Sequence, residues 1–372
     1  MANVHIRLNM IVKNEAPNIR GALDSVVSVI SSFCIVDTGS QDDTIDEIRK
    51  WAGSAGVPGE IHKDAWVDFG TNRSAALKLA VKDRVPSHIL FLDADDRVEV
   101  GTTFSQGEVE IGKSYKILNI SGNSSYTLPQ LVAVGERAWE WRAPLHEYLV
   151  PLGHEPVFGD LDALRIKKNV VQGGRSRGLS QREKYLRDAY VLQSYLEKQP
   201  NDARFQYYLG QSYRDAGEWS KAIASYRRRL EMPGWDQETY HAMLQIGLCR
   251  ERLNQTGDAI EAYLDAWKFR RTRCDALYSL IRILRIKENY EIANLFVDLA
   301  LGVAVSHGDT HFVDAGASRW RLFDEASIVK YWVGDHKKSL LFANMALEYE
   351  FWDPQQRLRI QKNARFAQDA IT

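Results

Sequence analysis

The sequence predicts an α/β domain with a Rossmann-like, mostly parallel sheet over residues 1–170, followed by an all-α helical repeat domain over residues 171–372. Three observations predict this fold class. Strand-like and helix-like segments alternate near the N-terminus, as they do where right-handed crossovers join parallel strands. A short apolar strand ends abruptly in a cluster of acids. Beyond about residue 180 the strand signals disappear, and apolar residues recur at helical spacing.

The elements of the α/β domain alternate in type along the chain. A strand and a polar turn occupy residues 6–15, and residues 16–31 carry apolar side chains every three or four positions, which predicts a helix. The following predicted elements are a strand over 33–36, a helix from Thr44, a strand over 60–62, a helix around 75–80 and a strand over 88–92. Residues 126–134 predict further strands of a mixed region.

The strand over residues 88–92 ends in Asp93, Asp95 and Asp96. Open α/β sheets bind their ligands outside the carboxyl ends of the strands, so these acids are candidate site residues. Clustered carboxylates repel one another, and a hard divalent cation that also binds phosphates would offset their charge. The alternative is a solvated acidic turn without a ligand.

Four motifs together resemble the family-2 glycosyltransferases of GT-A fold. The motifs are Met10–Glu15, Val36–Ser40 with Asp43 and Thr44, Asp68-Phe69 before Arg73, and Leu92–Asp95. They cover roughly the first 100 residues, and the closest resemblance is to the subgroup that continues into tetratricopeptide repeats, which includes peptide S-glycosyltransferases. The resemblance implies a nucleotide-sugar donor, an inverting transfer, and Mn²⁺ or Mg²⁺ as cofactor.

The resemblance also implies roles for individual residues. Donor nucleotide binding is assigned to Asn14, Glu15, Asp37, Arg73, Asp93 and Ala94. Asp95 is assigned to the metal. A carboxylate such as Asp37 suits the hydrogen-bond donors of a uridine, and a guanidinium matches phosphate oxygens. The alternatives are that Arg73 is a surface charge paired with Asp64 or Asp68, and that Asp37 only caps a turn.

Two positions depart from the family pattern. Arg73 is followed by Ser74, where the family usually has Asn. Where matching members tend to carry a His after the transferase core, this chain has Lys167 and Lys168. A lysine facing the diphosphate would take over part of the metal's work; the alternative, which the sequence favours for both lysines, is a solvated linker charge.

A general base is expected in the second half of the α/β domain, because an inverting transfer must deprotonate the acceptor hydroxyl or thiol. His146 and Glu147 follow Trp139 and Trp141 and match a His-Glu pair of the family. Glu147 is assigned as the base and His146 as a metal or phosphate contact, and the reverse assignment stays open. The two tryptophans are candidates for a sugar or acceptor platform. The alternative is a His packed under the tryptophans with Glu147 on the surface.

The helical region contains a repeat. Leu209-Gly210, Gly217, Ala222-Ile223 and Tyr226 recur 37 residues later as Ile246-Gly247, Asn254, Ala259-Ile260 and Tyr263. A weaker copy includes Ala293 and Ala300, and a fourth has Gly334 at its turn. Small residues at such positions allow close helix pairing, which resembles tetratricopeptide repeats. Such arrays present a partner-binding surface, buttress a neighbouring domain or form a homodimer.

Charge divides unevenly between the two regions. Residues 1–165 hold 16 Lys and Arg against 23 Asp and Glu, whereas the remainder holds 32 against 26. Arginines cluster at 175–187, 227–229 and 270–273. A basic helical region favours an anionic acceptor such as nucleic acid, with peptide as the other candidate and solvated helix faces as the default explanation.

Composition excludes several classes of protein. The three cysteines lie far apart and lack metal-ligand spacing, which indicates a reducing compartment rather than a disulfide scaffold. No secretory signal pattern and no apolar stretch long enough for a bilayer is visible, so we expect a cytoplasmic protein without a membrane partner. Two function classes stay open: an active, UDP-sugar-dependent transferase acting on a peptide side chain, a glycan or a hydroxylated base of modified viral DNA, or a degenerate transferase domain that serves a repeat-based scaffold.

Overall fold

The computed structural model describes residues 4–82, 86–121, 124–135, 138–168, 178–303, 309, 316–317, 320–349 and 353–372. The chain forms two compact units, Met1–Ser180 and Gln181–Thr372. The predicted domain boundary at residue 170 falls within 169–177, outside the described residues. Both predicted architectures are confirmed: a mixed, mostly parallel sheet with helices, followed by a unit that is all helical in its described part.

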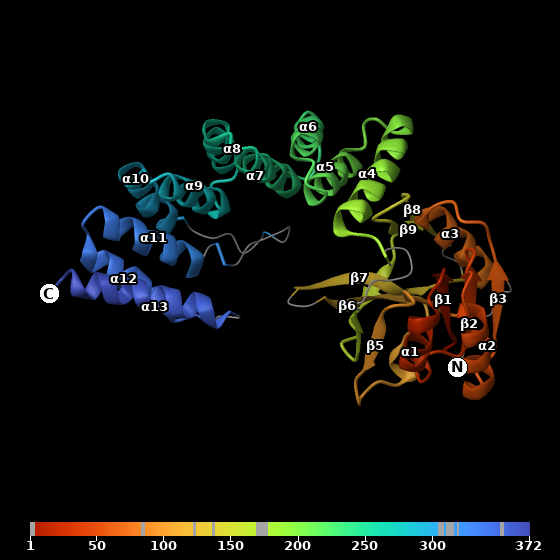
Figure 1. The fold of residues 1–372 in the computed structure, drawn as a ribbon. Coiled ribbons are helices and arrows are strands. Elements are labelled where there is room, and N and C mark those ends of the chain that lie inside the picture. The colour runs from red at the N-terminus through yellow and green to blue at the C-terminus, as the bar shows by residue number, and fades with distance from the viewer. Residues whose placement is uncertain are drawn as a thin grey trace. The chain divides into compact units, whose positions relative to one another are not determined.

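The N-terminal unit alternates strand and helix through its first half, as predicted (Figure 1). Its first elements are β1 (Ile6–Val12), α1 (Ala16–Val26), β2 (Ser32–Asp37), α2 (Thr44–Ala55), β3 (Gly59–Lys63), α3 (Phe69–Ala80) and β4 (His88–Phe91). The rest are β5 (Arg97–Val100), a 3₁₀ turn η1 (Gln106–Glu108), β6 (Lys113–Ser121), β7 (Ser124–Ala133), β8 (Ala138–Arg142), β9 (Tyr148–Leu152), β10 (Val157–Gly159) and β11 (Leu164–Lys167).

The large sheet has the order β3-β2-β1-β4-β7-β6-β11-β5, with β10 beside β6. Strands β3, β2, β1 and β4 are parallel, and β7 then pairs antiparallel with both β4 and β6. The carboxyl ends of β2, β1 and β4 therefore lie at one edge, which brings the turn residues after these strands together. Strands β8 and β9 form a separate hairpin.

Helices cover both faces of the sheet, and β1 shows why. Its apolar residues Ile6, Leu8 and Met10 enter the same buried cluster as residues of α1 and α2. The residues between them point to the other face, where Arg7 and Asn9 donate to carbonyls of Ala80 and Ala76 on α3. A strand buried on both sides is expected in the middle of a parallel sheet.

The C-terminal unit is an array of helix pairs (Figure 1). Its helices are α4 (Gln181–Lys198), α5 (Ala203–Asp215), α6 (Trp219–Leu230), α7 (Asp236–Arg252), α8 (Thr256–Phe269), α9 (Asp275–Ile286), α10 (Tyr290–Leu301), α11 (Trp320–Trp332), α12 (His336–Leu347) and α13 (Pro354–Asp369).

The predicted repeat turns are confirmed at Gly217, Asn254 and Gly334, and a fourth turn of the same kind lies at Glu288. The turns after α5, α7, α9 and α11 each place one residue in the left-handed region, with φ of 77° at Gly217, 59° at Asn254, 57° at Glu288 and 81° at Gly334. In each turn the following residue donates its N–H five positions back, as in Gln255 to Arg250 at 2.9 Å. This is the Schellman closure of a helix end. The sequence did not indicate Glu288, because its side chain is not one that favours this conformation.

Close helix pairing explains the small residues of the repeat. A Cβ atom added to Gly210 would lie 2.7 Å from the ring of Tyr226, and one added to Gly247 would lie 2.4 Å from Tyr263. Both tyrosine rings are fully buried. The 37-residue repeat in the sequence is therefore a repeated contact between a glycine on one helix and a tyrosine on its partner.

The arginine clusters at 227–229 and 270–273 contain both buried and exposed side chains, so only some of their members can belong to a solvated or nucleic-acid-binding face. Arg229 is fully buried and pairs with Glu238 at 2.5 Å, so it is not a surface charge. Arg273 is buried against Asp275, and Arg270 pairs with Asp236 and Asp309. Arg227 and Arg228 are exposed. Arg229, Arg270 and Arg273 are thus engaged in ion pairs within the unit and differ from the exposed Arg227 and Arg228.

Cys34, Cys249 and Cys274 are buried free thiols. Across the described ranges, no helix combines the length and the apolar character that crossing a bilayer requires.

Candidate functional site

Arg73 joins the acidic strand end to the predicted base. Its Nη2 donates to Asp93 Oδ1 at 2.5 Å, and its Nε donates to Glu147 Oε1 at 2.8 Å. Arg73 is only 8% exposed, and its guanidinium carbon lies 5.1 Å from the centroid of the Trp141 ring. The alternative in which Arg73 is a surface charge beside Asp64 or Asp68 is therefore wrong. Asp68 instead accepts the N–H of Thr71 as the N-cap of α3.

His146 and Glu147 lie in the turn between β8 and β9, which is fixed on the first turn of α3. Phe69 and Gly70 donate their N–H groups to the carbonyls of Pro144 and Ala143 at 3.3 and 3.0 Å. Gly70 permits this approach, since a Cβ there would lie 2.4 Å from the Ala143 oxygen. The β8–β9 turn thereby holds Glu147 at a set distance from Arg73.

Ser74, the departure from the family pattern, adds a second link between α3 and the hairpin. Its hydroxyl donates to the Trp141 carbonyl at 3.0 Å and accepts the Trp141 N–H at 2.9 Å. Ser74 therefore positions the strand that places Trp141 over Arg73. The sequence marked this residue only as a deviation, because a contact to a strand 67 residues away leaves no local pattern.

The structure places His146 and Glu147 differently from the packed-histidine alternative. His146 is exposed and has a φ of 54°, whereas the Glu147 side chain is only 15% exposed. That alternative, with His under the tryptophans and Glu147 on the surface, is wrong. The choice of base between the two stays a prediction.

Lys168 and Lys167 have unlike environments although they are neighbours. Lys168 Nζ lies 2.5 Å from Asp96 Oδ2 and 3.4 Å from Asp93 Oδ2. Lys167, on β11, points to the opposite side and pairs with Glu99 at 2.5 Å, with more than half of its side chain exposed. The linker-charge alternative is therefore wrong for Lys168, while Lys167 lies away from the acidic strand end.

The turns after β1 and β2 form the other side of the edge. Asp37 is 2% exposed and accepts the N–H of Ser40 at 3.0 Å, a contact that agrees with the turn-capping alternative. Asn14, with φ of 56°, accepts the N–H of Gln41 through its side chain, and the Glu15 N–H donates to the Thr44 hydroxyl. These bonds hold the two turns together.

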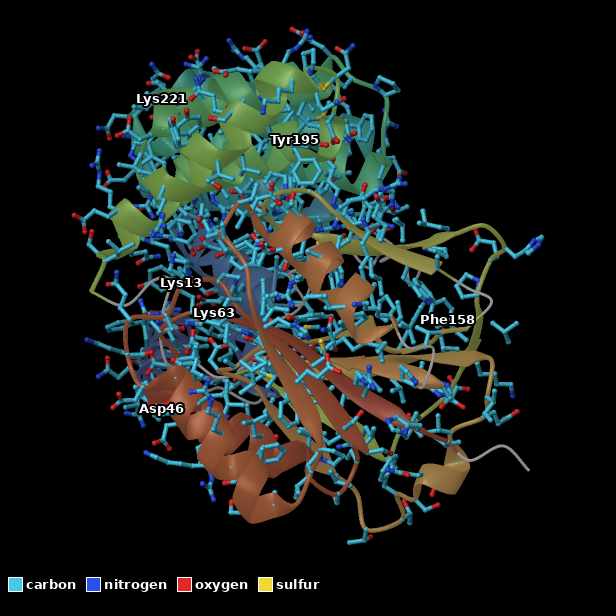
Figure 2. All side chains as sticks on the ribbon, turned by 90° about the vertical axis from the view of Figure 1, so that its right-hand side faces the viewer. Lys13, Asp46, Lys63, Phe158, Tyr195 and Lys221 are labelled. Carbon is cyan, nitrogen blue, oxygen red and sulfur yellow. The ribbon has the colours of Figure 1, made fainter. Side chains whose placement is uncertain are left out.

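Two exposed lysines lie at this same edge. Lys13 follows β1 and Lys63 ends β3, and both are labelled near the converging strand ends in Figure 2. Ala94, in contrast, is buried between the acids and offers only its backbone to a ligand. The edge thus combines a carboxylate-rich centre with basic side chains at its margin.

Electrostatics separate the three acids after β4. Burial favours the neutral form of Asp93, but Arg73 and Lys168 outweigh it and hold the pKa of this carboxyl below its usual range. Burial and the charge of Asp93 raise the pKa of Asp95, and they raise the pKa of Asp96 to about 7. Burial would lower the pKa of Lys168, yet Asp93 and Asp96 raise it above the usual range, so this amine stays protonated.

The donor set for a divalent cation is narrow. Both oxygens of Asp93 face cations, and Asp96 faces Lys168. Asp95 is half-buried and has no ion pair within the described ranges, and no group of three His, Cys, Asp or Glu side chains there is arranged to hold a metal. These residues fit a cation that Asp95 shares with substrate phosphates and water, as Mg²⁺ commonly is, rather than a resident ion in a protein cage.

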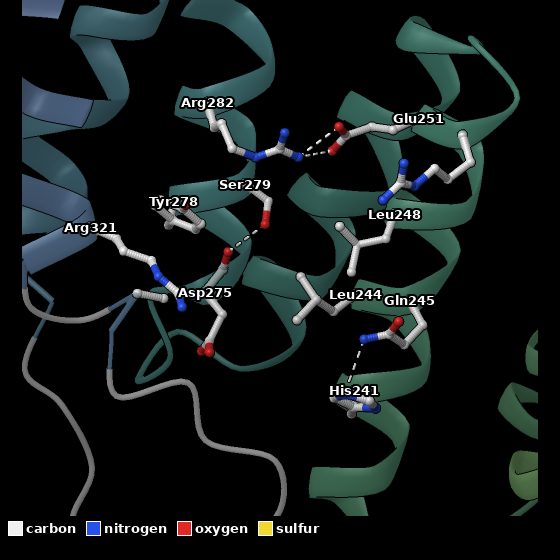
Figure 3. A pocket seen from close by; sticks show the side chains of 12 residues that line it. His241, Leu244, Gln245, Leu248, Glu251, Asp275, Tyr278, Ser279, Arg282 and Arg321 are labelled. Atoms are coloured by element: carbon white, nitrogen blue, oxygen red, sulfur yellow. Dashed lines mark hydrogen bonds and ion pairs between the residues drawn. The ribbon is translucent and has the colours of Figure 1, made fainter. Parts of the chain in front are cut away.

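A second candidate site is a pocket of about 690 Å³ in the helical unit (Figure 3). It lies among α7, α9 and α11, the first helices of successive pairs. Its charged lining residues are Glu251, Arg252, Asp275, Arg282 and Arg321. Glu251 pairs with Arg282 at 2.6 Å and Asp275 with Arg273, and the lining itself carries three arginines against two acids.

Comparison with known proteins identifies part of the N-terminal unit. Residues 9–103 match the model described as "Glycosyl transferase family 2". This segment runs from β1 to the end of the acidic strand region and contains Arg73 and the three acids. No curated protein matches the chain.

Several solved structures are similar to part of the chain. The crystal structure of MamA is 16% identical and covers 48% of this chain and 95% of its own, with a TM-score of 0.37. BtubC from P. vanneervenii is 15% identical and covers 54% and 85%, with a TM-score of 0.41. YrrB, described as a TPR protein with an unusual peptide-binding site, is 15% identical and covers 50% and 84%, with a TM-score of 0.35.

Proposed function

We propose that this chain is an inverting glycosyltransferase that uses a UDP-sugar. Its residues 9–103 match the family 2 glycosyl transferases, and TPR-like repeats follow in the helical unit. The observation that carries the proposal is the bridge that Arg73 makes between Asp93 and Glu147 at the carboxyl edge of the sheet. It unites a phosphate-binding type of side chain, the acidic strand end and a carboxylate able to act as a base.

In the proposed reaction the acceptor hydroxyl or thiol attacks the anomeric carbon of the sugar. The new bond forms on the face of the sugar opposite the diphosphate. The bond between the anomeric carbon and the diphosphate breaks, and UDP leaves with the electron pair. The acceptor proton passes to Glu147, whose placement on the fixed β8–β9 turn makes it the preferred base, with His146 as the other candidate. Arg73 orients Glu147 and donates to the donor's phosphates.

Mn²⁺ or Mg²⁺ at Asp95 would neutralise charge on the departing diphosphate. Asp95 supports this assignment because its carboxyl lies within the electrostatic influence of Asp93 and Glu15, and their like charge would be relieved by a cation. Asp37, Asn14 and Glu15 are assigned to the nucleoside in this proposal, and the position of their turns at the same edge as Asp95 supports the assignment.

The helical unit is the proposed acceptor-binding part. Its pocket among α7, α9 and α11 combines apolar surface from Leu244 and Leu248 with a positive excess of arginine. An anionic segment of a macromolecule, either an acidic peptide or a nucleic acid carrying a hydroxylated base, fits this lining. A homodimer through the helices is a further proposal that native mass spectrometry would test.

The experiment has two arms. Unfolding of the full chain is first followed with UDP, GDP, CDP and ADP in the presence of Mn²⁺; a ligand at 100 times its dissociation constant adds about 2.7 kcal/mol to the free energy of unfolding. Peptide, glycan and hydroxymethylated-DNA pools are then incubated with UDP-sugars and analysed by mass spectrometry. A hexose mass added to one pool supports the transferase, whereas absence of any nucleotide binding favours a scaffold without catalysis.

A further inference from the structure

We propose that Lys168 is a built-in cation for the donor's diphosphate, so that the chain binds a nucleoside diphosphate even without a divalent metal. This inference rests on the proposed function and deepens it. It begins from the position of one amine. Lys168 Nζ lies between the carboxylates of Asp93 and Asp96, where an ion bridging the two acids would lie.

The backbone around Lys168 is fixed. Strand β11 pairs with both β6 and β5, and the Lys168 N–H continues the pairing by donating to the Ile120 carbonyl at 2.8 Å. Residues of β11 alternate between the core and the surface, with Leu164 and Ile166 buried and Arg165 and Lys167 exposed. Lys168 is therefore the first residue after the strand that turns toward the acids, and its register is set by the sheet.

The amine is partly open to a ligand. The side chain of Lys168 is 21% exposed and that of Asp93 is 39% exposed, whereas Asp96 is buried beneath them. An ammonium group has three N–H donors, and Asp93 and Asp96 account for two. Among the residues that the structure describes, no acceptor is seen for the third, which can donate to a phosphate oxygen; lysine binds phosphate as a compact point charge.

A protonated amine cannot ligate a metal, so Lys168 changes what the site needs from one. Arg73 contacts one carboxylate oxygen of Asp93 and Lys168 contacts the other. Each brings a permanent positive charge to the place where the diphosphate would lie. Asp95 is left as the one acid of the strand end, within the described chain, without such a partner. A cation there would add to the fixed charges rather than replace them.

The test measures UDP binding to the full chain by calorimetry, in excess EDTA and in Mn²⁺. The variants are Lys168→Met, Lys168→Arg and, as matched control, Lys167→Met, which removes an equal charge one residue away. We expect wild type and Lys167→Met to bind UDP in EDTA. Lys168→Met should weaken that binding about 10- to 100-fold, the effect of losing one hydrogen bond between charged groups, and Lys168→Arg should retain it. UMP, which lacks the second phosphate, should respond less to Lys168→Met.

Loss of Lys168 leaves Asp96 buried without a partner, so a second variant guards against misfolding. Lys168→Met with Asp96→Asn removes both charges, whereas Asp96→Asn alone keeps the amine. Of these two variants, the double variant should show the same loss of UDP binding in EDTA as Lys168→Met, about 10- to 100-fold, and Asp96→Asn should keep the binding. Equal binding by wild type and the double variant in EDTA would overturn the inference. UDP binding that requires Mn²⁺ in wild type would also overturn it while leaving the proposed function standing. If none of UDP, GDP, CDP and ADP binds in either buffer, the proposed function itself fails, and the inference falls with it.

Discussion

Arg73 shows how much of the proposed chemistry depends on single side chains. Its guanidinium is buried, stacks on Trp141 and holds carboxylates from two distant segments. Removing one member of a buried, charged hydrogen-bond network leaves the others unpaired, which costs more than the bond itself contributes. For that reason the informative substitutions are made at the partners of Arg73 and at Asp95 rather than at Arg73.

The first prediction concerns Asp95. Asp95→Asn should remove the Mn²⁺ dependence of donor binding and abolish metal-stimulated transfer, while the melting temperature stays unchanged or rises. The reason is that burial and the charge of Asp93 already disfavour the ionised Asp95 carboxylate, so a neutral side chain relieves repulsion. Transfer rate and UDP affinity are measured against Mn²⁺ concentration. The control is Asp24→Asn, an exposed acid on α1; an unaltered Mn²⁺ response in Asp95→Asn would remove the metal assignment.

The second prediction separates the two candidates for the base. Glu147→Gln should lower the transfer rate by about 10²–10⁴, the usual contribution of a positioned general base, with UDP affinity little changed. Glutamine keeps an oxygen for the Nε–H of Arg73, so the turn should stay in place. His146→Ala is measured in parallel. A catalytic defect in His146→Ala alone would exchange the two roles, and loss of UDP binding in Glu147→Gln would move Glu147 to the donor site.

At the scale of elements, the repeated contact between paired helices determines which glycine substitutions the helical unit tolerates. Gly247 on α7 lies against the ring of Tyr263 on α8, and neither element can move apart without opening the buried cluster between them. The exposed Gly257 on α8 has no atom within contact distance of an added Cβ. Gly247 therefore has no room for a side chain, whereas Gly257 has open space beside it.

The third prediction uses this pair. Gly247→Ala should destabilise the helical unit by about 1–3 kcal/mol, as overpacking does. Gly257→Ala should leave it unchanged or stabilise it by up to about 1 kcal/mol, because alanine is the better helix former. Denaturant unfolding of the full chain, followed by far-ultraviolet circular dichroism, measures both. Equal effects of the two substitutions would mean that the α7–α8 packing is looser than the glycine–tyrosine contact implies.

At the scale of the whole molecule, the question is whether the basic excess of the helical unit binds the acceptor. The structure removes Arg229 from any such test, because loss of one partner of a buried ion pair typically costs about 3–5 kcal/mol and would unfold the unit instead. Arg227 and Arg228 remain as exposed charges of the same cluster.

The fourth prediction follows from these two residues. If the acceptor is a nucleic acid, replacing Arg227 and Arg228 by Ala should raise the acceptor KM and reduce the slope of log rate against log salt by about 0.7–0.9 for each lost phosphate contact. The donor KM should stay constant. The control replaces Arg49 and Lys50, exposed residues on α2 of the other unit, and carries the same loss of charge. Transfer rates against KCl on duplex, single-stranded and peptide acceptors decide; a flat profile on every acceptor that works excludes nucleic acid.

The sequence by itself determined the architecture. Alternating strands and helices, the acidic strand end, the glycosyltransferase motifs and the 37-residue helical repeat are local or periodic, and such patterns survive in one dimension. They located the sheet, the acidic carboxyl end of β4, and the turns at Gly217, Asn254 and Gly334. The sequence did not predict the turn at Glu288, because the left-handed conformation there is imposed by the helix pair rather than favoured by the glutamate side chain.

Only the tertiary structure decided which charges meet. Arg73 pairs with Glu147, 74 residues away, and Lys168 with Asp93, 75 residues away. These contacts depend on the register of β11 against β6 and on the β8–β9 turn resting on α3. The same holds for Arg229, which looks like its neighbours Arg227 and Arg228 in the sequence and is buried in the fold. A charged residue's partner is set by the packing of distant elements, and no local pattern records it.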